Sequence, residues 1–190
     1  ALNKFCQKHP HANISITIKS RRELLHWERG EHFDVALASL PFEQRVFKKK
    51  SFISFPAVIA ISTSHPLNKK KQIHVKDLHD ENLISLEPTG IFQTSIRKKL
   101  QEKNIKPIFK IQTTSMLQSA QMVENNIGIA IIDPFIGHII KNKKVIIKRL
   151  NPQIYFDYAY IWPEGRELSA LAEEFIIELK KTANSVTKIK

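Results

Sequence analysis

Three side chains near the start of the chain, Cys6, His9 and His11, are of the types that bind zinc, which prefers thiolate and imidazole ligands in a tetrahedral set. They lie together in the stretch CQKHPH. The other interpretation of this stretch is a helix end followed by a turn at Pro10, which needs no further ligand. We favour the turn and expect no metal site.

Two further histidines lie near residues that suggest acid-base chemistry. His32 is close in sequence to Asp34, and His65 precedes Pro66. Asp34 stands before an apolar run, where a carboxylate more simply caps the loop. The residue before a proline is restricted to extended conformations, so His65 marks the point where a strand leaves its sheet. We therefore expect no catalytic residue and no enzyme activity.

The motifs of common catalytic and phosphate-binding sites are absent. The sequence contains no G-x-G-x-x-G, G-x-x-x-x-G-K, G-x-S-x-G, H-E-x-x-H or C-x-x-C, and only five glycines occur in the chain. Without these motifs, phosphate-loop and hydrolase functions lose their main support. We expect no cofactor.

The first elements follow the order strand, helix, strand. Residues 12–20 (ANISITIKS) alternate apolar and polar, which predicts a strand. Ser20 and Glu23 form a capping-box pattern at the start of a helix over residues 20–30, which Gly30 ends. Residues 33–41 predict a second strand. This order implies a parallel pair with a right-handed crossover.

The remainder continues the alternation of strands and helices, and the fold class is α/β. A short basic helix or turn is predicted over residues 135–144, and the last helix has one apolar face. The predicted strands cover residues 54–62, 82–88, 108–112, 127–133, 144–150 and 154–163, and the predicted helices cover 89–104, 113–126 and 165–184.

Polar and small residues follow the carboxyl ends of the predicted strands. In open α/β sheets these ends line the ligand site, and helix N-termini there have free N–H groups that suit a carboxylate. Simple capping explains each loop taken singly, but five such loops favour a shared binding site. The candidate ligand-binding residues are Ser20, Arg21, Ser39, Pro88, Thr89, Gly90, Ser115, Asp133, Pro134 and Phe135.

Composition places further limits on function. The 190-residue chain is 42% hydrophobic and carries a net charge of +12, with lysines and arginines in short separated groups. This spacing favours a solvated surface over a DNA-binding patch, although direct contact with anions or DNA stays open. No apolar run long enough to cross a membrane occurs. The chain has one cysteine and no secretory signal, so we expect a cytoplasmic protein without membrane contact.

The order and spacing of several short stretches resemble one protein family over nearly the whole chain. The stretches are KHPHANISI, LLHWERGEHFDVALASLP, FPAVIAISTSHPL, DLHDENLISL and MVENNIGIAIIDP. Together they resemble the effector-binding domain of LysR-type transcriptional regulators, a bacterial family. LISLEPTG and GIAIIDPF look like the subgroup that includes lysine- and opine-responsive members.

The resemblance implies a fold like that of type 2 periplasmic binding proteins, with two α/β subdomains, two crossover strands and an effector cleft between them. Subdomain I would comprise residues 1–61 and 157–190, and subdomain II residues 62–156. The crossover strands would be AVIAIS and YFDYAYIW, lying side by side. His65-Pro66 would then mark the exit from the hinge, and Lys69-Lys70-Lys71 a solvated turn.

The resemblance also implies the partners. The effector would be an amino acid or an opine-like carboxylate, bound through the Pro88-Thr89-Gly90 helix start. Asp133 or Glu87 would receive its ammonium, and Phe135 would form an apolar wall. The chain would form a homodimer, or a tetramer in full-length form. DNA would be contacted only through an N-terminal helix-turn-helix that this sequence does not contain.

Three alternatives remain at this stage. A solute-binding protein of a transport system has the same fold but requires export. An α/β enzyme would need a nucleophile or an acid-base pair, for which Asp133 and Glu87 are the only candidates. Direct DNA binding through the basic middle of the chain would show a steep salt dependence.

Overall fold

The computed structural model describes the chain except for residues 21–22, 25–31, 141–143 and 187–190. The chain divides into two compact units, one formed by Ala1–Ile53 with Asp157–Lys188 and the other by Ser54–Phe156. Both units combine strands with helices, so the predicted α/β class is confirmed. The predicted helix over residues 20–30 lies mostly outside the described residues, but its capping box is present: Ser20 and Glu23 exchange two hydrogen bonds.

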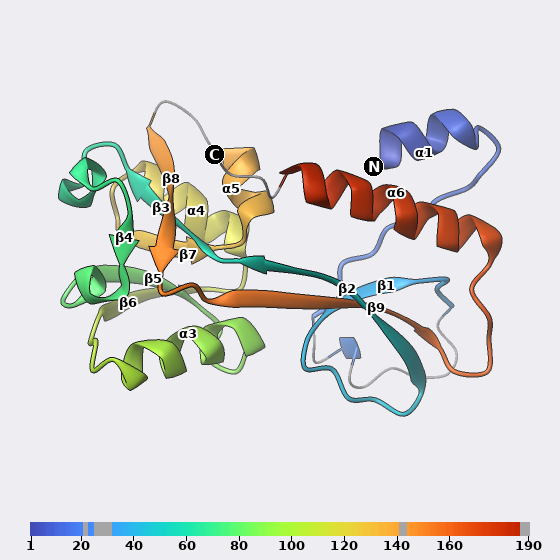
Figure 1. Ribbon diagram of the computed structural model, residues 1–190, viewed down its shortest axis with the longest axis horizontal. Coiled ribbons are helices and arrows are strands. Elements are labelled where there is room, and N and C mark those ends of the chain that lie inside the picture. Colours follow the sequence, from blue (N-terminus) through green and yellow to red (C-terminus); the bar gives the residue numbers. More distant parts are fainter. Residues whose placement is uncertain (21–22, 25–31, 141–143, 187–190) are drawn as a thin grey trace. The chain divides into compact units, whose positions relative to one another are not determined.

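Two helices of the first unit pack together, α1 (Leu2–Lys8) and α6 (Ala170–Val186), as Figure 1 shows. The ring of Phe5 from α1 meets the ring of Phe175 from α6 edge-on, with centroids 5.2 Å apart. His9, one of the residues weighed as a zinc ligand, lies 2.6 Å from the carboxylate of Glu174 on α6. Its partner is therefore an acidic side chain of a neighbouring helix.

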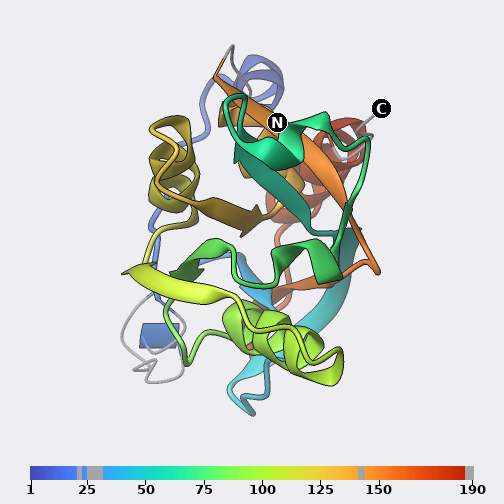
Figure 2. The ribbon, with the colours of Figure 1, turned by 90° about the vertical axis from the view of Figure 1, so that its left-hand side faces the viewer.

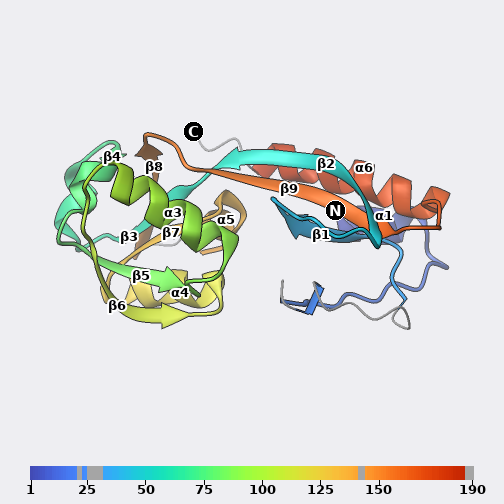
Figure 3. The ribbon, with the colours of Figure 1, turned by 90° about the horizontal axis from the view of Figure 1, so that it is seen from below.

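A three-stranded sheet accompanies these helices, with β9 (Tyr155–Pro163) between β1 (Ala36–Ser39) and β2 (Phe47–Pro56) (Figure 3). β1 runs antiparallel to β9. Most of β2 was not predicted: the strand predicted over residues 54–62 includes only its last three residues, and lysines 48–50 were interpreted as part of a solvated surface. Lysines are common on edge strands, where they discourage pairing with other chains, and β2 is such an edge.

The predicted strand over residues 12–20 is wrong. The structure places no strand there, and Ile14, Ile16 and Ile18 are 41%, 66% and 96% exposed. Alternation gives a segment one apolar face, but a strand also needs a ladder with a neighbouring strand, and residues 12–20 belong to neither sheet of the described residues. The expected parallel pair with residues 33–41 is consequently absent from the described residues.

The second unit is built on a mixed six-stranded sheet in the order β4-β8-β3-β7-β5-β6. β5, β6 and β7 are mutually parallel neighbours, whereas β3 runs antiparallel to β7 and β8. Apolar side chains of β3, β7 and α4 contribute to one of its core clusters. The strands are β3 (Val58–Ser62), β4 (Ile73–His74), β5 (Asn82–Leu86), β6 (Ile108–Thr113), β7 (Ile129–Ile132) and β8 (Val145–Asn151).

The position of β3 corrects the expected hinge. AVIAIS was predicted to lie beside YFDYAYIW, but β3 pairs with β7 and β8 inside the second unit, and all five of its residues are buried. The neighbours of β9 are β1 and β2. β2 and β9 are the strands that have residues in both units, so β2 takes the place given to β3.

Two helices connect the parallel strands, α3 (Ile91–Glu102) and α4 (Met116–Glu124). They lie on opposite faces of the sheet (Figure 2), as right-handed crossovers from β5 to β6 and from β6 back to β7 require. Gly128 precedes β7, and a Cβ there would lie 2.6 Å from the backbone oxygen of Asn82. Only glycine therefore allows β7 to begin this close to β5.

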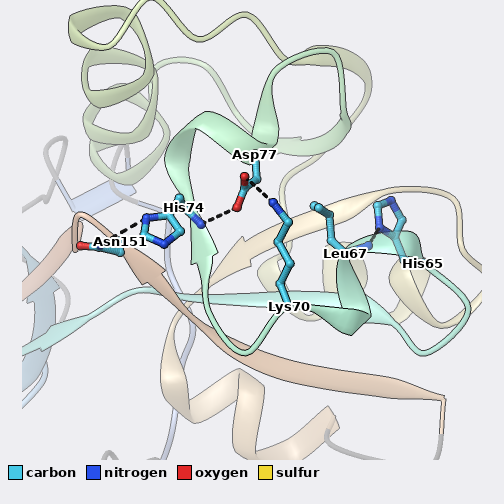
Figure 4. Close-up of polar contacts among 6 residues, drawn as sticks. All are labelled: His65, Leu67, Lys70, His74, Asp77 and Asn151. Atoms are coloured by element: carbon cyan, nitrogen blue, oxygen red, sulfur yellow. Dashed lines mark hydrogen bonds and ion pairs between the residues drawn. The ribbon is translucent and has the colours of Figure 1, made fainter.

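The segment that follows β3 folds into two 3-10 turns, η1 (Pro66–Lys69) and η2 (Val75–Leu78). His65 is extended, as its place before proline predicts, and its Nδ1 accepts the N–H of Leu67 (Figure 4). Of the three lysines predicted to be solvated, Lys70 binds the carboxylate of Asp77 at 2.6 Å. That carboxylate also accepts the N–H of His74.

The Asp77 carboxylate is nearly buried, with a side-chain exposure of 7%. Burial by itself would raise its pKa, but hydrogen bonds from Lys70 and the His74 N–H lower the pKa below the ordinary value of 3.8. A lowered pKa adds stability above the pKa of the unfolded chain, and this contribution is lost as pH falls through the folded pKa. Asp77 therefore stabilises the turns at neutral pH.

We expect Asp77→Asn to lower the free energy of unfolding by about 1–2 kcal/mol at pH 7, because it removes the charge that pairs with Lys70. The difference from wild type should shrink as pH falls below about 4. Urea denaturation followed by circular dichroism measures both. Asp80→Asn is the control, since Asp80 is exposed and has a positive φ of 59° that asparagine tolerates. An equal loss in the control would contradict the prediction.

Candidate functional site

Most predicted site residues gather at one edge of the second unit. β5, β6 and β7 are parallel neighbours, so their carboxyl ends at Leu86, Thr113 and Ile132 lie at the same edge of the sheet. The residues that follow these ends are Pro88, Thr89, Gly90, Ser115, Asp133, Pro134 and Phe135. Topology thus brings seven of the ten predicted residues to three adjacent loops.

The other three predicted residues belong to the first unit. Ser20 uses its backbone N–H and its hydroxyl oxygen in the capping box with Glu23. Ser39 ends β1 and is in register with Tyr158 of β9. Arg21 lies outside the described residues. Their predicted contact with a ligand stays a prediction.

Two of the three helices that start at this edge are capped by their own side chains. At α4, Ser115 Oγ accepts the N–H of Gln118, and the Thr113 hydroxyl accepts the N–H of Ser115. At α5 (Pro134–Ile140), Asp133 Oδ1 accepts the N–H of Ile136 at 2.7 Å. Capping of this kind satisfies backbone donors that have no acceptor within the helix.

α3 differs because its N-cap residue is Gly90, which has no side chain to accept a hydrogen bond. The preceding turn closes through the N–H of Gly90, which donates to the oxygen of Glu87 at 3.0 Å. Thr89 is exposed. The first-turn N–H groups of α3, from Ile91 to Gln93, therefore point toward this edge with no cap from the helix's own N-cap residue.

Gln93, which sequence analysis missed, lies in this first turn and is only 2% exposed. Its Oε1 accepts the N–H of Leu86 at the end of β5, at 3.0 Å. Its Nε2 is buried and has no hydrogen-bond partner among the described residues. An unsatisfied buried donor costs about 1–3 kcal/mol, so it requires an explanation. The sequence signal was weak: a glutamine on the same helix face as Ile96 and Leu100.

Four phenylalanines form a cluster that connects the starts of α3 and α5. Phe92 stacks on Phe156, whose ring lies 5.7 Å from that of Phe55, and Phe55 meets Phe135 edge-on at 4.8 Å. Phe55 and Phe156 are buried, whereas Phe92 and Phe135 are partly exposed. The cluster therefore supports an apolar surface beside the helix starts. Phe92 was another residue that sequence analysis missed.

Asp133 has unusual electrostatics for a capping carboxylate. Burial raises its pKa above the ordinary value of 3.8, and N–H groups of Ile136 and Phe135 offset only part of this effect. For a carboxyl with a raised pKa, stability is highest below the unfolded pKa and falls as pH rises through the folded pKa. The stability contributed by Asp133 therefore changes with pH in the direction opposite to that contributed by Asp77.

We expect Asp133→Asn to be as stable as wild type or more stable at pH 7, because asparagine caps a helix equally well and carries no buried charge. Asp133→Ala, which loses the cap, should be less stable by about 1 kcal/mol. Denaturant midpoints at pH 4 and pH 7 test this. The prediction is contradicted if wild type gains stability relative to Asp133→Asn when the pH is raised from 4 to 7.

Within the part of the chain that the structure describes, no helix is long and apolar enough to span a membrane. No cluster of metal-binding side chains occurs in the same residues. At this edge of the second unit, the uncapped backbone donors of α3 lie in the same part of the fold as the partly exposed rings of Phe92 and Phe135. Such a surface is suited to a small anion with an apolar part.

Comparison with known proteins agrees with this architecture. The chain is 22% identical over 174 residues to the regulatory protein NocR of Agrobacterium tumefaciens strain T37, covering 92% of this chain and 58% of NocR. It is 23% identical to the transcriptional activator LysR of Escherichia coli K12, covering 92% of this chain and 56% of that protein. The chain thus spans somewhat more than half the length of these relatives.

Solved structures show the same fold. The regulatory domain of CcmR from Synechocystis PCC6803, in complex with 2-PG, matches with a TM-score of 0.78 and 20% identity, over 98% of this chain and 89% of that one. HinK, a LysR family transcriptional regulator from Pseudomonas aeruginosa, matches with a TM-score of 0.80 and 18% identity, over 95% of this chain and 63% of that one. The family model described as LysR substrate binding domain matches residues 1–184. The chain therefore belongs to the family of LysR substrate-binding domains.

Proposed function

We propose that this chain is the ligand-sensing domain of a LysR-type transcriptional regulator and that it binds a small, amino-acid-like carboxylate at the start of α3. The observation that carries the proposal is the difference among three neighbouring helix starts. Ser115 and Asp133 cap α4 and α5, whereas Gly90 leaves α3 without a side-chain cap. An effector carboxylate would supply the missing acceptor.

The physical basis is the charge of the helix terminus. Free N–H groups and the helix dipole give an N-terminus a partial positive charge that favours an anion. α3 is 12 residues long, so its dipole is fully developed. Thr89 adds an exposed hydroxyl next to Gly90, which as a glycine lets a ligand approach the backbone closely.

Acidic and apolar groups of the same edge suit the rest of an amino acid. Asp133 and Glu87 are the proposed partners of the ammonium group. A cation beside Asp133 would stabilise the carboxylate whose pKa burial raises. Phe135, held by Phe55, is the proposed apolar wall. The CcmR regulatory domain in complex with 2-PG supports the idea of a small ligand for this fold.

Regulation would follow from preferential binding to one conformation, because a ligand shifts an equilibrium only by its difference in affinity for the two states. The proposal includes a cytoplasmic homodimer or tetramer whose DNA contacts come from a helix-turn-helix outside the present sequence. The relatives NocR and LysR are named as a regulatory protein and a transcriptional activator, which supports this role. Lysine or an opine is the proposed effector class.

A charge placed at residue 89 tests the proposed site. Thr89→Glu should weaken binding of a carboxylate effector at least about tenfold, since it places a negative charge at the helix start, whereas Thr89→Gln, of nearly the same size, should weaken it by less than about threefold. Isothermal titration calorimetry with lysine, an opine and 2-PG measures both variants. Equal binding by the two variants would remove the α3 site from the proposal.

A further inference from the structure

We propose that Gln93 is a specificity-determining residue, and that its buried Nε2 donates a hydrogen bond to an oxygen of the effector carboxylate. This inference rests on the proposed function and adds to it a side-chain donor. The site would then combine the backbone N–H groups at the start of α3 with the amide of Gln93.

The orientation is fixed by one hydrogen bond. Because Leu86 N–H is a donor, the amide atom facing it at 3.0 Å must be the oxygen Oε1. The group left over is therefore the NH₂ group, which can only donate. It is buried, and none of the described residues accepts from it.

Gln93 is an exception among the buried polar side chains of the second unit. Ser85 donates to the oxygen of Ile111, and Ser119 donates to the oxygen of Met116. Thr113 and Ser62 also have hydroxyl partners, Gln118 and Ser64. Since buried polar groups are nearly always paired, the open position at Nε2 indicates an acceptor that comes from outside the described residues.

The location of Gln93 points to the effector as that acceptor. The side chain reaches from the first turn of α3 back to the last residue of β5, so the amide lies beside the turn Glu87–Gly90, where the effector carboxylate is proposed to bind. Side chains of a helix lean toward its N-terminus, which places the amide at the same end as the free N–H groups.

Nε2 has almost no exposed surface, so an effector reaches it only after a local movement, and the neighbouring turn Glu87–Gly90 is the proposed moving part. The turn is held by few contacts. Gly90 N–H donates to the Glu87 oxygen, and the Thr94 hydroxyl contacts the oxygens of Pro88 and Gly90. Glu87, Pro88 and Thr89 are exposed. Binding would shift this turn, which follows Leu86 directly, so that the effector carboxylate reaches the Gln93 amide.

The substitution Gln93→Glu tests the donor. Glutamate has the same shape and can still accept the Leu86 N–H, while its burial should raise the pKa of the new carboxyl and the helix start should lower it. At pH 8 it presents a second acceptor in place of the NH₂ group, so it should repel a carboxylate. When protonated it regains a donor, so the loss of binding should diminish at low pH.

The experiment is isothermal titration calorimetry of L-lysine and L-lysinamide into wild type, Gln93→Glu and Gln101→Glu at pH 8 and pH 5. Gln101→Glu is the matched control, because it makes the same change on an exposed position of α3. We expect Gln93→Glu to weaken L-lysine binding at least tenfold at pH 8. The preference for L-lysine over L-lysinamide, which lacks the carboxylate, should be smaller in this variant than in wild type. The dissociation constant of Gln93→Glu for L-lysine, divided by that of wild type, should be at least threefold smaller at pH 5 than at pH 8.

Each outcome decides between the two proposals. If Thr89→Glu weakens L-lysine binding while Gln93→Glu binds like wild type at both pH values, the α3 site stands and the role of Gln93 is overturned. If Gln101→Glu loses as much affinity for L-lysine as Gln93→Glu, the loss comes from added negative charge anywhere on α3, and the role of Gln93 is again overturned. If wild type binds neither L-lysine nor another carboxylate of the panel, both proposals fail.

Discussion

The close approach of β7 to β5 is the constraint on which the candidate site depends. It requires Gly128, because a Cβ at that position would lie 2.6 Å from the backbone oxygen of Asn82. β5 is thereby held between β7 and β6, and all three run in parallel. Their loops must then open at one edge, whichever side chains those loops carry. Gly128 has no functional side chain, but it allows the strand arrangement that brings the candidate site loops to one edge.

At that edge, three helices solve the same physical problem in different ways. Each start leaves backbone N–H groups without acceptors. Ser115 satisfies part of them with a hydroxyl at α4, and Asp133 does so with a desolvated carboxylate at α5. At α3 the N-cap is Gly90, and the buried amide of Gln93 adds one more donor that has no partner among the described residues. Of these three helix starts, α3 is therefore the one with a side-chain donor left open, beside the partly exposed rings of Phe92 and Phe135.

The comparison of expected and observed elements shows where sequence patterns are sufficient. Strands such as β5 and β7 were predicted because short apolar runs between turn residues are typical of buried parallel strands. Residues 12–20 have a good strand pattern and form no strand, because pairing depends on a neighbour that periodicity does not report. β2 is the opposite case: most of this strand was not predicted, and its lysines lie on an edge strand of the sheet. The exchanged roles of β2 and β3 follow from the same cause, since strand order is a long-range property.

The sequence by itself determined the α/β class, the family resemblance and the loops that carry Thr89, Gly90 and Asp133, because these depend on local periodicity, turn residues and caps. Only the tertiary structure decided which loops adjoin, that β2 accompanies β9, and that Asp77 pairs with Lys70. It also decided that the Gln93 amide is buried, that its oxygen accepts the Leu86 N–H, and that its nitrogen has no partner in the described part of the chain. The reason is that burial and hydrogen-bond partners are set by residues distant in sequence, whereas a helix start is set by its neighbours.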